Sequence, residues 1–199
     1  VEAESSNPYD DPTWATDPNN TDYNRPNATT ATKTDTPIME TPVNVQVVPQ
    51  QVLKDQQIIR MDKALENVSG VIARPSADTG IGGGDSFMLR GFDSFPASVY
   101  RDGMRLVFSG QTDLAAIERV EVLKGPAAIL YGRIEPGGLI NQVGKQPLAN
   151  PFYALQQQFG SFDLYRTTLD TTGPITSDKS LKYRFNLAFE TANSFQEFI

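Results

Sequence analysis

The sequence contains no cysteine and no histidine. Without cysteine, the chain can form neither a disulfide nor a thiolate metal site. Without histidine, it lacks the commonest general base and the commonest metal ligand of proteins. An enzyme built on this chain would have to rely on carboxylates, so the choice of reactions open to it is short.

Long apolar runs are also missing. No stretch of 18 apolar residues exists, so no membrane-spanning helix is expected. No signal peptide is visible at Val1, which favours a mature or trimmed chain. The net charge is −7, and residues 1–40 hold eight acids against two bases, so most of the negative charge belongs to the start of the chain. This balance argues against nucleic acid as a partner.

Residues 1–36 are rich in asparagine, aspartate, threonine and proline and contain almost no aliphatic side chains. Such a segment cannot bury enough apolar surface to offset the entropy of ordering it. We therefore expect a disordered acidic tether over residues 1–36, of which about the first 33 should be removable without damage to the rest of the chain.

The remaining chain is organised around residues 117–146. Val120 and Val122 alternate with polar residues, which predicts a strand with one buried face. The polar positions are Arg119, Glu121 and Lys124. A glycine–proline turn, one helical turn at 127–130 and a second turn at Pro136-Gly137-Gly138 then lead into another apolar strand. The segment contains no catalytic triad, metal-ligand spacing or phosphate loop.

These residues carry a family resemblance. Their motifs are Glu118-Arg119-Val120-Glu121-Val122-Leu123-Lys124-Gly125-Pro126, Leu130-Tyr131-Gly132 and Pro136-Gly137-Gly138-Leu139-Ile140-Asn141, preceded by Arg90-Gly91-Phe92 and Tyr100-Arg101-Asp102-Gly103. In this order, the chain from about residue 34 onward resembles the plug and first barrel strands of TonB-dependent outer-membrane siderophore receptors of the ferrichrome type. Several linked motifs are far more specific than a single short pattern.

The expected fold class is an α+β plug domain, a small mixed β-sheet with short helices, over residues 37–148. Residues 149–199 then alternate with period two, most clearly at 181–190, as do the first antiparallel strands of a transmembrane β-barrel. An antiparallel sheet of a soluble domain would show the same period. Because three strands cannot close a barrel, we expect a piece of a longer receptor of about 22 strands.

The resemblance implies a ligand-gated importer of a ferric siderophore in the outer membrane of a Gram-negative bacterium. The plug would lie inside the barrel and the tether in the periplasm, where TonB binds a short extended segment and supplies energy. Val1-Glu2-Ala3 are candidates for the last residues of that segment. The implied partners are the ferric siderophore, TonB and outer-membrane lipid. Iron would arrive as a chelate, so no cofactor or metal bound by protein ligands is expected.

The resemblance also nominates site residues. The ligand-binding candidates are Arg90, Phe92, Arg105, Leu106, Val107, Phe108 and Leu114. Leu114-Ala115-Ala116 stands where the family often carries an aromatic residue, which disfavours ferrichrome itself and leaves a ferric siderophore, with the hydroxamate type preferred. For Arg90, an ion pair with a barrel carboxylate is the alternative role.

The central strands carry many charges. Arg90, Glu118, Arg119, Glu121 and Lys124 are expected to pair with each other or, between plug and barrel, with Arg166, Arg184 or Glu190, because a buried isolated charge costs several kcal/mol. Solvation in a wet lumen is the alternative.

Other functions remain open. Another TonB-dependent cargo, such as a cobalamin, a saccharide or a metal complex, would fit the same motifs. A soluble β-rich interaction domain is the alternative from a different class. An enzyme would need paired carboxylates among Glu118, Glu121 and Glu135, yet Glu118 and Glu121 should face opposite sides of a strand.

Overall fold

A computed structural model describes residues 14–74, 85–94, 98–106 and 111–193 of the chain. The chain divides into two compact units, Val1–Gly144 and Lys145–Ile199. The candidate TonB-binding residues Val1-Glu2-Ala3 lie outside the described residues, and so do the glycine-rich residues 79–84.

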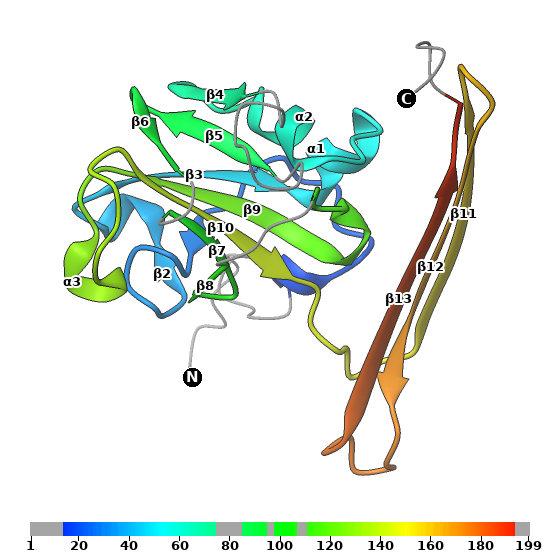
Figure 1. Cartoon of the computed structure of the whole chain (residues 1–199). Helices are drawn as coiled ribbons and strands as arrows, with labels where there is room; N and C mark the ends of the chain where they lie inside the picture. The colour runs from blue at the N-terminus through cyan, green and yellow to red at the C-terminus, as the bar shows by residue number, and fades with distance from the viewer. Residues whose placement is uncertain (1–13, 75–84, 95–97, 107–110, 194–199) are drawn as a thin grey trace. The chain divides into compact units, whose positions relative to one another are not determined.

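A five-stranded mixed sheet forms the centre of the first unit (Figure 1). Its order is β3 (Asn44–Pro49), β9 (Ile117–Lys124), β10 (Gly138–Gly144), β7 (Val99–Arg101) and β8 (Met104–Arg105). β9 is antiparallel to both of its neighbours, whereas β10 and β7 are parallel. The mixed sheet with short helices confirms the expected fold class.

The turn between β7 and β8 was predictable from its sequence. Asp102 and Gly103 have φ angles of 49° and 78°, and two consecutive positive values characterise the type I′ hairpin turn that an aspartate–glycine pair favours. Gly138 is required for a different reason, since a Cβ atom there would lie 2.0 Å from the Leu123 carbonyl oxygen.

One face of this sheet is covered by helices α1 (Gln50–Asp55) and α2 (Met61–Leu65) and by a small sheet of β4 (Val71–Arg74), β5 (Ser86–Leu89) and β6 (Phe92–Asp93) (Figure 1). The main core cluster lies here and includes Val120, Val122, Ile140, Met61 and Phe87. Helix α2 begins at Met61 after Arg60, which caps it with no side-chain hydrogen bond. The core therefore fixes this helix by packing.

The opposite face is covered by residues 25–38, which we call the strap. β1 (Asn27–Ala28) pairs with β2 (Thr36–Pro37), and Ala28, only 1% exposed, belongs to a second core cluster with Tyr100, Leu123 and Leu139. The expectation of disorder is thus wrong for the strap. Small side chains fill this interface, so few aliphatic residues suffice.

The strap also changes the environment of β9. The alternation of Val120 and Val122 with polar residues predicts one buried face, but every residue from Ile117 to Leu123 is buried. The prediction is wrong because the strap buries the polar face as well.

Three long antiparallel strands form the second unit: β11 (Phe152–Gly160), β12 (Leu164–Pro174) and β13 (Lys182–Thr191). Large apolar side chains are exposed along one face, among them Tyr153, Leu155, Phe159, Tyr165, Phe185, Leu187 and Phe189. The other face carries ion pairs from Arg166 to Glu190 at 2.8 Å and from Arg184 to Asp170 at 2.7 Å. The period-two expectation is confirmed.

Among the described residues, no helix has the length and apolar character needed to cross a membrane.

Candidate functional site

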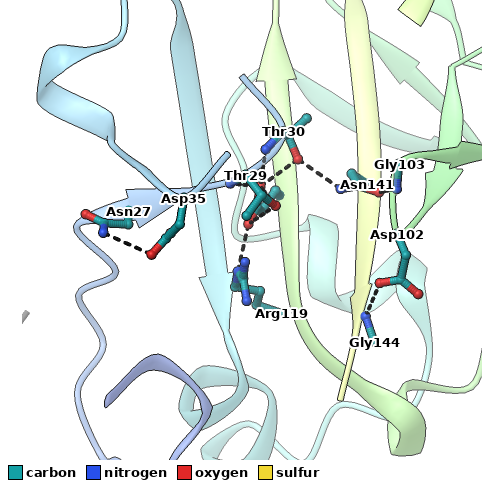
Figure 2. A network of polar contacts seen from close by, with 10 residues as sticks. Asn27, Thr29, Thr30, Asp35, Asp102, Gly103, Arg119, Asn141 and Gly144 are labelled. Atoms are coloured by element: carbon teal, nitrogen blue, oxygen red, sulfur yellow. Dashed lines mark hydrogen bonds and ion pairs between the residues drawn. The ribbon is translucent and has the colours of Figure 1, made fainter. Parts of the chain in front are cut away.

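The buried carboxylate of Glu121 joins the strap to the centre of the sheet. Figure 2 labels its partners Thr29, Thr30 and Arg119. Glu121, 0% exposed, accepts hydrogen bonds from the backbone N–H groups of Thr29 at 3.0 Å and Thr30 at 2.8 Å. The Thr30 hydroxyl donates to the same carboxylate at 2.5 Å, and Arg119 Nε donates at 2.7 Å. A buried ionised group needs such partners, and here most of them come from the strap.

Neighbouring strands and α3 (Ala128–Tyr131) complete this network. Asn141 Nδ2 donates to the Thr30 hydroxyl oxygen at 3.0 Å, and the Tyr131 hydroxyl donates to the Thr30 carbonyl oxygen at 2.8 Å. Burial, followed by the negative charge of Glu121, raises the pKa of Tyr131 to about 12. Tyr131 therefore remains a hydrogen-bond donor at physiological pH.

A second acidic residue of β9 also faces the strap region. The pairing register shifts so that Val143 opposes Arg119 while Gly144 opposes Ile117, which leaves Glu118 as the extra residue of a β-bulge. Burial lowers the pKa of Arg25, and the charge of Glu118 opposes that shift. The Arg25 guanidinium also lies 4.8 Å from the centre of the Trp14 ring.

A polar cleft of about 380 Å³ lies on the helix-covered side of the unit. Its lining is formed by Arg60, Asp62, Lys63, Arg74, Asp85, Ser86, Phe87 and Gln111. Asp85 accepts a hydrogen bond from the Thr112 backbone N–H at 2.8 Å, and burial raises the pKa of the Asp85 carboxyl. Arg74 pairs with Asp93 at 2.6 Å. Three cationic and two anionic side chains can hold a polar ligand through charge-assisted hydrogen bonds.

Among the described residues, two of the predicted ligand residues, Arg90 and Leu114, lie far apart. Arg90 follows the end of β5 and lies beside Gly125, after the last residue of β9, whereas Leu114 comes just before its first residue. An eight-residue strand separates these two ends by about 24 Å. Leu114 is 6% exposed and belongs to the main core, which leaves it little surface for a ligand.

The other candidates are dispersed. Phe92 and Arg105 are exposed and Leu106 is half-buried, while Val107 and Phe108 lie outside the described residues. Their contact with a ligand stays a prediction.

The structure gives the predicted charge-pair residues different partners. Arg119 and Glu121 form an ion pair within the first unit. Burial, and then the charge of Arg90, lowers the pKa of Lys124, whose ammonium donates to Gln46 and Ser69. Arg90 and Lys124 thus place two like charges at one end of the sheet.

Sequence reasoning missed the strap network and the cleft. Thr29 and Thr30 sit in a threonine-rich, acidic context that is typical of disorder, and only the structure shows that their backbone groups meet Glu121. Arg74 ends a short strand just before the glycine-rich stretch, a position that gives no signal of its own.

In the described part of the chain, no three acidic side chains gather closely enough to hold a metal ion. The strap network and the cleft offer hydrogen-bonded and charge-paired groups, which serve to bind and hold.

Comparisons with known proteins agree with this geometry. The TonB-dependent receptor plug domain family matches residues 37–139. The metal-pseudopaline receptor CntO of Pseudomonas aeruginosa strain UCBPP-PA14 is 41% identical over 178 residues, which cover 88% of this chain and 25% of that protein. The ferrichrome outer membrane transporter/phage receptor of Escherichia coli K12 is 31% identical, covering 84% and 23%.

Solved structures show the same likeness. The ferripyoverdine receptor of the outer membrane of Pseudomonas aeruginosa, bound to ferripyoverdine, matches with a TM-score of 0.79 and 26% identity, covering 89% of this chain and 24% of that one. The closed form of the ferric-catecholate import receptor Fiu of Escherichia coli K12 has a TM-score of 0.70 and 34% identity, covering 78% and 22%.

The fold and the matched motifs define a plug followed by the first strands of a barrel. The chain belongs to the TonB-dependent receptor family, whose members are outer-membrane proteins of Gram-negative bacteria, and it spans about a quarter of the length of the curated relatives it matches. These relatives are transport receptors.

Proposed function

We propose that this chain is the plug and barrel start of a receptor that imports a ferric siderophore through the outer membrane. The observation that carries the proposal is the succession of a plug sheet and an amphipathic three-stranded meander in a chain 26–41% identical to siderophore and metallophore receptors. Iron arrives as a chelate, TonB pulls on the N-terminal side, and the chain carries out no bond chemistry.

The cleft is a candidate place for a siderophore on the described part of the plug. The iron-binding oxygen atoms of hydroxamate and catecholate siderophores carry partial or full negative charge, which arginine and lysine bind well. Arg60, Lys63 and Arg74 supply three such side chains around one cavity. In this proposal the cleft takes the role that the motif resemblance gives to Arg90.

A second cargo is favoured by one relative. The relative that is 41% identical over most of the chain is named a metal-pseudopaline receptor. A metal complex other than a ferric siderophore is therefore the alternative cargo for the same machine.

The cationic end of the sheet carries charges that could pair with carboxylates of the barrel wall. Arg90 and Lys124 lie together, and the Lys124 ammonium donates hydrogen bonds to the neutral side chains of Gln46 and Ser69. Two adjacent cations are stabilised by nearby carboxylates. We therefore assign to this end of the sheet the plug–barrel ion pairs, with barrel carboxylates as partners.

Binding to the receptor that contains this chain tests the proposal. The purified receptor in detergent is titrated with ferric hydroxamate, ferric catecholate and non-ferric metallophore complexes. Arg74→Ala should weaken binding of the true cargo about tenfold or more, as expected for loss of a charge-assisted contact. Arg133→Ala, which removes an exposed arginine that does not line the cleft, is the matched control. The proposal is overturned if the receptor binds none of these complexes.

A further inference from the structure

In the described part of the chain, Glu121 accepts more hydrogen bonds from the strap than any other side chain of the sheet. Of the five groups that donate hydrogen bonds to Glu121 in the described part of the chain, four come from outside β9, and these are the backbone and hydroxyl groups of Thr29 and Thr30. The two threonines are consecutive, so a single carboxylate anchors the strap at one point (Figure 2).

Release of the strap would change the surroundings of Glu121 abruptly. While the strap is in place, the buried Glu121 carboxylate is fully satisfied. If the strap leaves, Glu121 keeps the bond from Arg119 and loses every donor of the strap at once. Hydrogen bonds to a charged group are stronger than neutral ones, and a buried charge that loses its donors is costly, so these bonds oppose release of the strap.

Other contacts position the strap without sharing this carboxylate. Tyr131 donates to the Thr30 carbonyl oxygen, and the Lys33 ammonium lies 3.5 Å from the centre of the Tyr131 ring. Ala28 packs into the second core cluster beside Leu123. Release of the strap would uncover that apolar cluster together with the Arg119–Glu121 pair.

We propose that the strap is a detachable clamp and that Glu121 is the residue that locks it. Tension applied from the N-terminal side passes the contacts of Tyr23 with Asp55 and of Arg25 beside Glu118 before it reaches Thr29 and Thr30. There the Glu121 lock resists it, and release of the lock opens the strap-covered face of the sheet. The source of this tension rests on the proposed function, since TonB would provide it. The lock itself depends only on the contacts of Glu121 with the strap.

The absence of cysteine allows a direct test, because a single introduced thiol is unique in the chain. The full chain is purified in detergent with either Ala28→Cys in the strap or Ala64→Cys in α2. Both alanines are almost completely buried, one in each core cluster. The rate of reaction with a thiol reagent reports how often each site opens.

In the parent chain, both thiols should react slowly. Adding Glu121→Ala should accelerate the Ala28→Cys site about tenfold or more and leave the Ala64→Cys site within about twofold, since charge-assisted hydrogen bonds are worth this much. Glu121→Gln, which keeps the shape and one acceptor oxygen, should give a smaller acceleration and provides a reading if the alanine variant folds poorly.

Asp102→Asn is the matched control. Asp102 also accepts a hydrogen bond from a backbone N–H, that of Gly144 at 2.8 Å, but it has no contact with the strap in the network of Figure 2. This variant should leave the strap site slow. The proposal is overturned if Glu121→Ala does not accelerate the strap site, or if it accelerates both sites equally, because Glu121 would then support the whole plug.

The test separates this inference from the proposed function. Thiol reactivity needs neither siderophore nor TonB. If Glu121→Ala leaves the reaction rate at the strap site unchanged in a receptor that still imports siderophore, the clamp proposal alone fails. If it accelerates that reaction in a receptor that binds no siderophore, the transport proposal alone fails.

Discussion

The two units of this chain place charge and apolar surface in opposite ways. The first unit packs apolar side chains on one face of its sheet and hides the charged pair Arg119–Glu121 under a strap on the other. The second unit exposes its apolar side chains along one face and pairs Arg166 and Arg184 with acidic residues on the other. The sheet of the first unit is therefore covered on both faces. The apolar face of the second unit is exposed and requires an apolar environment.

Removal of detergent should have the largest effect. The exposed apolar face of the second unit and its unpaired strand edges should drive the chain into aggregates in plain buffer. Size-exclusion chromatography with light scattering would show this as loss of the monomer peak. A monodisperse, cooperatively folding monomer without detergent would contradict the contrast between the units.

The next largest effect is expected in the main core. Phe87 is 0% exposed, so Phe87→Ala should lower the free energy of unfolding of the first unit by about 3–5 kcal/mol. Denaturant titration in detergent, followed by circular dichroism, measures this. Phe185→Ala is the matched control, because Phe185 is 52% exposed on the apolar face and should leave the first unit unaffected. Equal effects of the two changes would remove the contrast.

A substitution on the strap-covered face of the sheet should lower the free energy of unfolding by a smaller amount. Thr30→Val keeps the shape of the side chain but removes the hydroxyl that donates to Glu121 and accepts from Asn141. We expect a loss of about 1–3 kcal/mol, the usual cost of leaving buried polar partners unsatisfied. Fluorescence of Trp14, the only tryptophan, reports the strap region. Thr34→Val, at an exposed position, should change the fluorescence midpoint little.

The smallest effect concerns alkaline pH. The pKa of Tyr131 rises from the usual 10.0 to about 12, so the unfolded chain loses this proton at a lower pH than the folded one. The stability of the first unit is therefore unaffected by Tyr131 below pH 10 and falls as the pH rises from about 10 to 12. Because Tyr131 is only half-buried, solvent reduces the size of this loss. Tyr131→Phe should flatten the pH dependence of the unfolding midpoint in that window, and an unchanged slope would contradict the assignment.

Much of the fold could be predicted from local chemistry. The Asp102-Gly103 turn, the glycine–proline boundaries around 125–138 and the period-two strands after residue 151 each depend on neighbours in the sequence. The helical turn at Gln50–Asp55 follows a proline in the same way. Such features need no knowledge of the tertiary structure.

The strap could not be predicted because its stability comes from a distant partner. Thr30 and Glu121 are 91 positions apart, and the composition of residues 25–38 is that of a disordered segment. A polar segment that supplies donors to a buried carboxylate folds without much apolar area. The same distant contact explains why β9 is buried on both faces.

The candidate site was predicted less well than the fold. The motif resemblance points to Arg90, but the cleft is lined by Arg60, Arg74 and Asp85, which come together only through the pairing of β4 with β5 and the approach of Thr112. Arg90 instead lies beside Gly125 and Lys124. The order of residues in the sequence does not show which loops and strand ends will lie together in the folded plug.

Uptake and binding of a radiolabelled ferric siderophore, measured on the same cells, test the central claim most directly. The receptor that contains this chain is compared with a variant lacking everything N-terminal to Arg25, which keeps the strap. We predict that the variant binds the siderophore with an affinity within about twofold of the parent and imports none. The deletion removes the segment on which TonB would pull and leaves the plug intact. Uptake at the parental rate, or a collapse of binding, would contradict this claim.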